Sequence, residues 1–204
     1  MTERGIRKSV AAGKAVVAVV TAVLAILATT GVAGAAAGAA AGPGRAGAGP
    51  DFSAQARSAG LNGSQAAELQ SRVDGYLATM GGTQVAANKI SLDGGALLVP
   101  LPGEARARDL AAPGDVRGLA ATCPYTYVCA YQLPNFTGAT LTFFTCDKLN
   151  PIPWGGTGSW INNQRSGLHA KFYDVNGNLG WTSPGGYSED PAAPWGWVYW
   201  LSPC

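Results

Sequence analysis

The chain has 204 residues and a formal net charge of +2, which leaves room for one or two small domains. Residues 1–36 hold four of the 14 basic residues and one of the 12 acidic residues, so the rest carries 14 − 4 = 10 basic and 12 − 1 = 11 acidic side chains. A nearly neutral chain without a basic run gains no affinity from counterion release, so we exclude a nucleic acid as its partner.

Residues 1–36 have the composition of a secretory signal peptide. Four basic residues come first, an uncharged run extends from Ala15 to about Gly34, and small residues close the segment. The run is also long enough to cross a bilayer, so a retained membrane anchor is the alternative. We expect cleavage, secretion into the extracellular space and no stable membrane association afterwards. Residues 37–50 are Ala/Gly/Pro-rich and are predicted to be a flexible linker.

Residues 51–104 predict a small α+β segment, a helix followed by a hairpin. The helix is capped by Asn62 or Ser64, ends at Gly81–Gly82 and has one apolar face, formed by Ala66, Leu69, Val73, Tyr76, Leu77 and Met80. The hairpin has TQVAANKISL as one arm, ALLVPLPG as the other and Asp93–Gly94–Gly95 as its turn. A unit of this size buries little surface, so we expect it to be marginally stable alone.

Residues 105–120 are predicted to be a linker that exposes Arg106, Arg108 and Arg117 to proteases. From residue 121 onward, short aromatic runs alternate with glycine- and proline-containing turns, which predicts an all-β domain. This region holds all six tryptophans, at positions 154, 160, 181, 195, 197 and 200. We interpret most of them as core residues, with a sugar-binding platform as the alternative.

Four cysteines in this region predict two disulfides. If YTYVCAY and ATLTFFTC pair around QLPNFTG, positions whose numbers add up to about 270 lie opposite each other. Cys123 then faces Cys146, which leaves Cys129 to bond Cys204 and hold the C-terminus to the first strand. The absence of a Cys-x-x-Cys pair argues against a cysteine metal site.

A spacing in the first hairpin recurs 42 residues later. Tyr131 precedes Gly138 by seven residues, as Tyr173 precedes Gly180, and each tyrosine ends a strand. The pattern predicts a folded-over hairpin in which the ring packs beneath a turn that needs glycine.

The stretch YVCAYQLPNFTGATLTFF, followed by SWINNQRSGLHAKFYD, resembles the Greek-key motif of βγ-crystallin-type domains. Tyr131, Phe136 and Gly138 match its hairpin signature, and Ser166 matches the serine that pins the hairpin from a later strand. The second copy departs from the pattern, with Asn178 in place of the aromatic residue and no later serine.

The sequence CPYTYVCAY and the late cysteine are similar, more specifically, to the secreted actinobacterial peptidase inhibitors with this fold, a family that includes inhibitors of thermolysin-like metalloproteases. This resemblance implies that residues 121–204 form a βγ-crystallin-like Greek-key sandwich that inhibits an extracellular peptidase. We expect a monomer.

The loop NNQRSG at 162–167 resembles the calcium loop of microbial βγ-crystallins, which offers Asn162, Asn163 and Ser166 as oxygen donors. Gly167 replaces the last serine of that pattern and no carboxylate lies in the loop, so a turn held by side-chain hydrogen bonds is the alternative. We therefore expect no cofactor other than a possible calcium ion.

We expect no enzyme activity. His169, the only histidine, has no acid or nucleophile near it in the sequence. The carboxylates Asp147, Asp174, Glu189 and Asp190 are scattered among turn residues, and nothing supports a glycosidase-like pair.

The candidate inhibitory loop is Pro151, Ile152, Pro153 and Trp154, where two prolines would stiffen an exposed connection and present Ile152 and Trp154. The sequence thus favours a secreted inhibitor that occludes a metalloprotease with a rigid loop. The alternative is a calcium- or glycan-binding extracellular module, possibly toxin-like.

Overall fold

The computed structural model describes residues 51–112 and 122–204. The predicted signal peptide, the linker at 37–50 and residues 113–120 of the second linker lie outside these ranges. The N-terminal elements are α1 (Ser53–Ser58), α2 (Gly63–Met80), β1 (Thr83–Ala86), β2 (Lys89–Leu92) and β3 (Gly95–Leu98). Within the described ranges, no helix has both the length and the apolar character needed to cross a membrane.

The predicted helix is present with its predicted cap. The Asn62 side chain accepts a hydrogen bond from the backbone N–H of Gln65 at 2.9 Å, and the Gln65 side chain accepts one from the Asn62 N–H at 3.0 Å. This reciprocal pair satisfies two of the free donors at the helix start. Gly81, with φ of 70°, follows the last helical residue, and Leu69 and Val73 are fully buried.

The predicted hairpin at Asp93–Gly94 is present between β2 and β3, but TQVAANKISL is not a single arm. It forms both β1 and β2, which turn at Ala87–Asn88. The turn depends on a buried side chain, because the Asn88 amide donates to the carbonyl oxygens of Val99 at 2.9 Å and Arg108 at 2.7 Å.

The N-terminal segment and the all-β region share one sheet. β3 pairs with β5 (Thr137–Phe143), and Leu97 lies opposite Leu141 in this pairing. Gly95 lies against Phe143 and the carbonyl of Thr142, where a Cβ would not fit. The residues of α2 and β3 and those of the later strands therefore belong to one hydrophobic core.

In the described part of the predicted linker, Arg106 is exposed as expected, whereas Arg108 is not. Arg108 is buried and its guanidinium contacts the carboxylate of Glu104 at 3.0 Å and the carbonyl of Ala59 at 3.1 Å. One turn of the next hairpin is also attached to this segment, because the Gly138 N–H donates to the Ala105 carbonyl at 2.7 Å.

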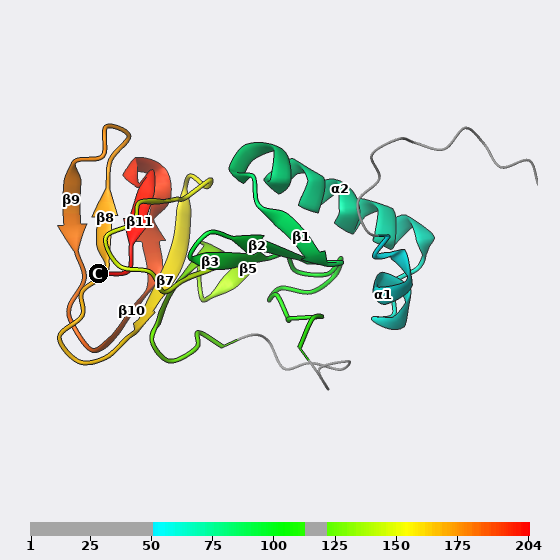
Figure 1. The fold of residues 1–204 in the computed structure, drawn as a ribbon, viewed down its shortest axis with the longest axis horizontal. Helices are drawn as coiled ribbons and strands as arrows, with labels where there is room; N and C mark the ends of the chain where they lie inside the picture. Colours follow the sequence, from blue (N-terminus) through cyan, green and yellow to red (C-terminus); the bar gives the residue numbers. More distant parts are fainter. Residues whose placement is uncertain (1–50, 113–121) are drawn as a thin grey trace, which may run out of the picture. The chain divides into compact units, whose positions relative to one another are not determined.

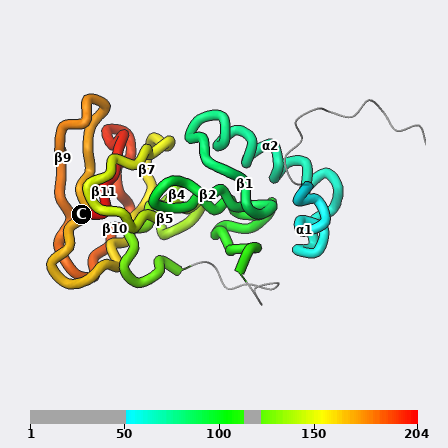
Figure 2. The backbone as a smooth tube through the Cα atoms, in the orientation of Figure 1, coloured from blue at the N-terminus to red at the C-terminus, as the bar shows by residue number. Residues whose placement is uncertain are grey.

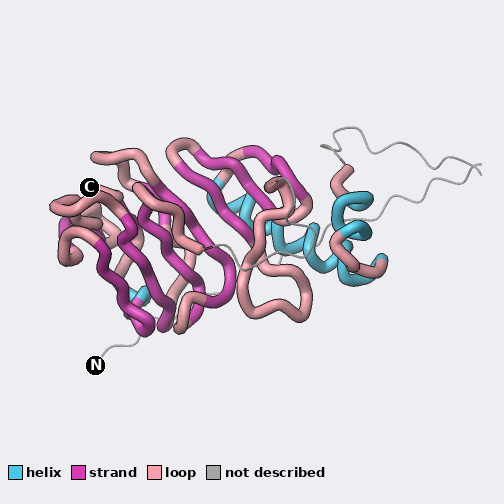
Figure 3. Tube along the Cα trace, turned by 90° about the horizontal axis from the view of Figure 1, so that it is seen from below, coloured by secondary structure: helices cyan, strands magenta, loops and turns pink. Residues whose placement is uncertain are grey.

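Two antiparallel sheets form the body of the molecule. The remaining strands are β4 (Tyr127–Leu133), β6 (Asn150–Pro151), β7 (Thr157–Asn163), β8 (Lys171–Tyr173), β9 (Leu179–Thr182), β10 (Tyr187–Pro194) and β11 (Trp200–Ser202), with a 3₁₀ turn η1 at Trp195–Trp197. The first sheet has the order β1-β2-β3-β5-β4-β7-β10 and the second the order β6-β11-β8-β9. Figures 1 and 2 show β8, β9 and β11 at the end of the molecule opposite α1, and Figure 3 shows the strands side by side from below.

The two sheets exchange strands. β4, β5 and β7 lie in the first sheet, whereas β6, which falls between β5 and β7 in the chain, pairs with β11 in the second. β8, β9 and β11 lie in the second sheet, whereas β10 pairs with β7 in the first. Each half of the all-β region therefore completes the sheet of the other half.

The two predicted disulfides form, but the predicted pairing is wrong. Cys123 bonds Cys129 and Cys146 bonds Cys204, with Cα–Cα distances of 5.7 and 4.7 Å. The predicted hairpin register is nearly right, since Cys129 lies opposite Thr142. However, β4 starts only at Tyr127, and Thr126, with φ of 75°, turns the chain back. Cys123 therefore folds onto its own strand instead of extending it toward Cys146.

We predict that a chain lacking residues 1–112 does not fold cooperatively. This truncation removes β3 from the edge of β5 and uncovers the core that Leu97 and Leu141 share. Each large buried side chain contributes about 1.5–3 kcal/mol, so the loss is on the order of 5 kcal/mol or more. A chain that starts at Asp51 is the control and should keep its melting transition. A cooperative thermal melt of the shorter chain, followed by circular dichroism, would contradict the prediction.

Candidate functional site

The turn between β4 and β5 folds over its own strands, as the sequence predicts. Tyr131 is 3% exposed, and its ring meets that of Phe136 edge-on, with centroids 5.6 Å apart and planes at 74°. Asn135, Phe136 and Gly138 have positive φ angles of 59°, 59° and 79°. The turn thus needs a left-handed backbone, which glycine adopts without strain.

The serine that pins this turn is Ser159, not Ser166 as predicted. Ser159 is fully buried in β7, where its hydroxyl accepts from the Phe136 N–H at 2.8 Å and donates to the Leu133 carbonyl at 2.7 Å. Ser166 is exposed in a loop beyond β7. The prediction failed because β7 begins at Thr157, so the residue next to the turn lies seven positions earlier in the chain.

The second copy of the spacing has a different structure. Gly180 has an ordinary φ, and the left-handed position belongs to Gly177, with φ of 77°. The Asp174 carboxylate holds this turn, because it accepts hydrogen bonds from the backbone N–H groups of Asn178 and Asn176. These bonds, together with one from the Asn178 side chain, lower the pKa of Asp174 below its usual value. Gly180 is needed for another reason, because a Cβ there would overlap the ring of Trp197. Tyr173 is half-buried.

The predicted inhibitory loop does not project from the surface. Ile152 and Trp154 are buried, at 6% and 8% exposure, and belong to the main core. The Trp154 Nε1–H donates to the hydroxyl of Tyr76 on α2 at 3.0 Å. Pro151 lies in β6 and Pro153 is half-buried beside it. The Trp154 hydrogen bond links this segment to α2, and the side chains at 152 and 154 face inward as part of the core.

A different loop, at residues 165–169, is exposed and held from below. All five of its residues are exposed, and they include the apolar side chain of Leu168. The fully buried amide of Asn162 donates to the Leu168 carbonyl at 2.9 Å and to the Pro184 carbonyl at 3.4 Å. The ring Nδ1 of His169 donates to the Ser183 carbonyl at 2.8 Å, since a carbonyl oxygen can only accept.

The three predicted calcium donors do not share one surface, because Asn162 is fully buried whereas Ser166 is exposed. Asn162 and Asn163 are consecutive in β7, and Asn163 donates instead to the Cys123 carbonyl at 2.9 Å. The Asn162 Oδ1 accepts from the backbone and side-chain N–H groups of Gln164. Their arrangement fits the alternative of a turn held by side-chain hydrogen bonds. Calcium binding stays a prediction, which a calcium-dependent rise in melting temperature would support.

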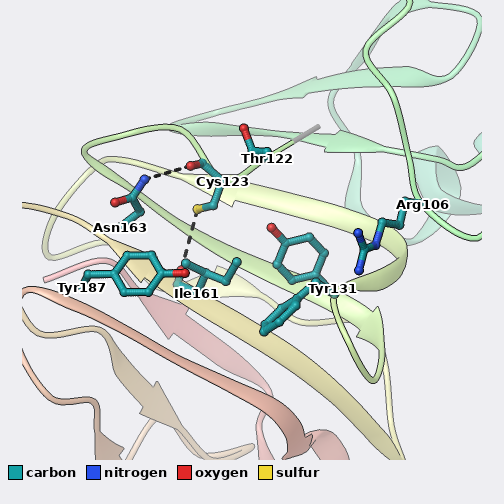
Figure 4. Close-up of a pocket in the computed structure, with 8 residues that line it drawn as sticks. Arg106, Thr122, Cys123, Tyr131, Ile161, Asn163 and Tyr187 are labelled. Atoms are coloured by element: carbon teal, nitrogen blue, oxygen red, sulfur yellow. Dashed lines mark hydrogen bonds between the residues drawn. The ribbon is translucent and has the colours of Figure 1, made fainter. Parts of the chain in front are cut away.

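A pocket of about 420 Å³ lies on the outer face of the first sheet (Figure 4). Its lining residues are Arg106, Thr122, Cys123, Tyr131, Phe136, Ile161, Asn163 and Tyr187. The Cys123–Cys129 loop closes one side, and Arg106, which donates to the Asn135 carbonyl at 3.1 Å, lies at the folded hairpin. Burial, and to a smaller extent the nearby Tyr187, raises the pKa of Tyr131 to about 12.

The residues considered for catalysis make local interactions. Asp190 accepts from the Ala192 N–H at 2.8 Å, and Glu189 accepts from the hydroxyl of Tyr187. Asp147 lies 4.0 Å from the ammonium group of Lys171. In residues 51–112 and 122–204, no three His, Cys, Asp or Glu side chains are close enough together to hold a metal ion.

These features define a disulfide-bonded β-sandwich that presents a hydrogen-bonded loop to solvent. Residues 117–181 match the model of peptidase inhibitor family I36, so this segment of the chain is similar to that family. The match covers less than half of the chain, but it includes the folded hairpin, Ser159 and the loop 165–169. It confirms the resemblance to peptidase inhibitors noted from the sequence. Neither a curated protein nor a solved structure matches the chain.

We predict that Gly138→Val destabilises the protein more than Gly180→Val. At Gly138 the positive φ alone costs a β-branched residue on the order of 1–3 kcal/mol, and a Cβ would also lie 3.0 Å from that of Gln132. At Gly180 the backbone is ordinary and the obstacle is the ring of Trp197, which is partly exposed and can move. Free energies of unfolding from urea titrations compare the two variants, and equal losses would contradict the prediction.

We also predict that Tyr131 makes the protein less stable above pH 10. The pKa is raised from 10 to about 12 on folding, so the unfolded chain loses this proton first. Stability is therefore complete below about pH 10 and falls by roughly 2 kcal/mol as the pH rises to 12. Tyr131→Phe should remove this part of the loss while leaving stability at pH 8 unchanged. Urea titrations between pH 8 and 12 test this, and identical pH profiles for the two proteins would refute it.

Proposed function

We propose that the chain is a secreted inhibitor that blocks an extracellular peptidase by placing the loop 165–169 in the peptidase cleft, with a thermolysin-type metallopeptidase as the first target to test. It acts by occupying the cleft and performs no chemistry of its own. The family match supports the inhibitor role. The choice of loop rests on its exposure and its hydrogen bonds, and it replaces the segment 151–154 considered from the sequence.

The observation that carries this proposal is the buried amide of Asn162. It bonds the loop carbonyl of Leu168, the carbonyl of Pro184 and the hydroxyl of Ser183. The loop also contains its own turn, since the Leu168 N–H donates to the Arg165 carbonyl at 3.1 Å. A loop already held in one conformation loses little entropy on binding, which is how a short exposed segment reaches high affinity.

The surroundings of the loop suit a contact with a cleft. Leu168 supplies an apolar side chain that an enzyme subsite can enclose. The neighbouring turn at 183–186 lies beside it, because Gly185 is next to the His169 ring and Gly186 is next to Ser166. Tyr187, 64% exposed, follows that turn and extends the surface toward the outer pocket. The surface offered to a peptidase therefore contains the apolar side chain of Leu168 and the aromatic side chain of Tyr187.

Secretion is supported by the chemistry of the cysteines. All four are paired within the described residues, and such disulfides persist in oxidising compartments outside the cytosol. The basic and apolar N-terminus predicted to be a signal peptide is consistent with the same route.

The test is a titration of the chain from Asp51 against a thermolysin-type metallopeptidase and, separately, a serine peptidase. We expect a stoichiometric loss of metallopeptidase activity. Leu168→Asp should raise the half-inhibitory concentration about 30-fold or more, since an apolar residue at an interface centre contributes 2 kcal/mol or more. Val175→Asp is the matched control, because Val175 is also an exposed apolar loop residue, in the β8–β9 turn.

The outcomes separate the two parts of the proposal. If the parent protein inhibits neither enzyme at stoichiometric concentrations, the proposed target classes are wrong. If the parent inhibits and Leu168→Asp inhibits equally well, the inhibitory surface lies elsewhere. If the parent inhibits the serine peptidase alone, the proposed target class is wrong. The loop assignment is then tested by comparing Leu168→Asp with Val175→Asp against the serine peptidase.

A further inference from the structure

An aromatic cleft opens between the two sheets, away from the loop 165–169. Its volume is about 450 Å³, within the range of small-molecule sites. Three of its aromatic residues, Trp160, Phe172 and Trp195, are buried, whereas Trp181 and Trp197 are 43% and 37% exposed. The described residues that line it are Trp160, Phe172, Gly180, Trp181, Asp190, Ala193, Pro194, Trp195, Trp197 and Val198.

The walls of the cleft are built from packed rings. Trp181 packs against Trp160 and Phe172, with centroid distances of 5.5 and 5.2 Å and tilted planes. On the other side the Trp197 ring lies against the backbone of Gly180, which has no side chain to keep it away. Gly180 thus brings the two exposed tryptophans into one site.

Among the described residues that line the cleft, Asp190 is the only charged one. It is half-buried in β10, opposite Trp160 of β7, and directly precedes the irregularity in that pairing between Asp190 and Ala193. Its neighbour Glu189 points to the other face of the sheet, because side chains alternate along a strand. Among the described residues no ion pair neutralises Asp190, and its recorded hydrogen bond comes from the Ala192 N–H.

We propose that this cleft binds a quaternary ammonium group. The faces of aromatic rings are electronegative and attract cations, and such groups are bound in aromatic cages. The lone carboxylate adds a negative charge that a cationic ligand neutralises and a neutral ligand leaves unpaired.

The lining also selects among cations. A guanidinium or primary ammonium group carries N–H donors that each need an acceptor, and Asp190 is the one acidic side chain among the described lining residues. Burying the remaining donors unpaired costs free energy. A trimethylammonium group has no N–H, so no hydrogen-bond donor is left unpaired when it packs against the aromatic walls.

Choline is the probe, and 3,3-dimethyl-1-butanol, which has the same shape without the charge, is its control. Binding to the chain from Asp51 is followed by tryptophan fluorescence and by calorimetry. We expect saturable choline binding and at least about fivefold weaker binding of the neutral alcohol. A parallel sedimentation assay with phosphatidylcholine vesicles distinguishes a headgroup at a lipid surface from a soluble ligand, and binding in either form supports the proposal.

Variants on one strand test the role of the charge. Asp190→Asn keeps the shape of the side chain and should weaken choline binding at least about fivefold, while Glu189→Gln, on the opposite face, should leave it unchanged. Gly180→Ala should weaken binding by displacing Trp197. A thermal melt of each variant shows that it is folded.

Three results would each overturn the proposal. Choline and the neutral alcohol could bind equally well, or the two carboxylate variants could have equal effects. The third is that no choline binding is detected up to a choline concentration of about 50 mM. In the last case Asp190 serves only to keep the edge strand β10 from pairing with another chain.

Discussion

The exchange of strands between the two sheets is the constraint on which the other features depend. Because β6 and β10 each lie in the sheet of the other half, the chain must cross between the sheets repeatedly. Two of these crossings, at 164–170 and 183–186, meet at Asn162. A buried amide is costly unless its donors and acceptor are paired, so the Asn162 hydrogen bonds fix both crossings at once. The rigidity of the exposed loop is thus a consequence of the topology, and no proline is needed for it.

The N-terminal segment has a structural role that its sequence did not reveal. β3 covers the edge of β5, which would otherwise present unpaired backbone groups to solvent. Tyr76 of α2 bonds the indole of Trp154, and Ala105 bonds the turn at Gly138. The segment therefore supports both the core and the folded hairpin, so residues 117–181, which match the inhibitor family, depend on residues that precede them in the chain.

Local features were predictable from the sequence and long-range partners were not. The Asn62 cap and the packing of Tyr131 beneath its turn depend on residues close in the chain, and both were predicted correctly. The pinning serine, the disulfide partners and the inward direction of Trp154 depend on where distant strands begin. Because β4 begins only at Tyr127 and β7 at Thr157, Cys123 does not face Cys146, and Ser159 rather than Ser166 lies next to the folded turn. The sequence predicted that position 180 requires glycine, but the requirement comes from the ring of the distant Trp197, which a Cβ there would overlap.

Strand β10 lies between the outer pocket and the aromatic cleft. Tyr187 and Glu189 face the outer pocket, whereas Asp190 lines the aromatic cleft. Beyond Asp190 the strand departs from regular pairing, and the Asn135 N–H of the folded hairpin donates to the Pro191 carbonyl at 2.9 Å within this irregular stretch. Bulges of this kind redirect side chains and are common beside binding sites. The hairpin thus fixes the stretch of β10 that borders the cleft. Because the pocket and the cleft lie on opposite faces of one strand, a single substitution in β10 can alter one of them and leave the other unchanged.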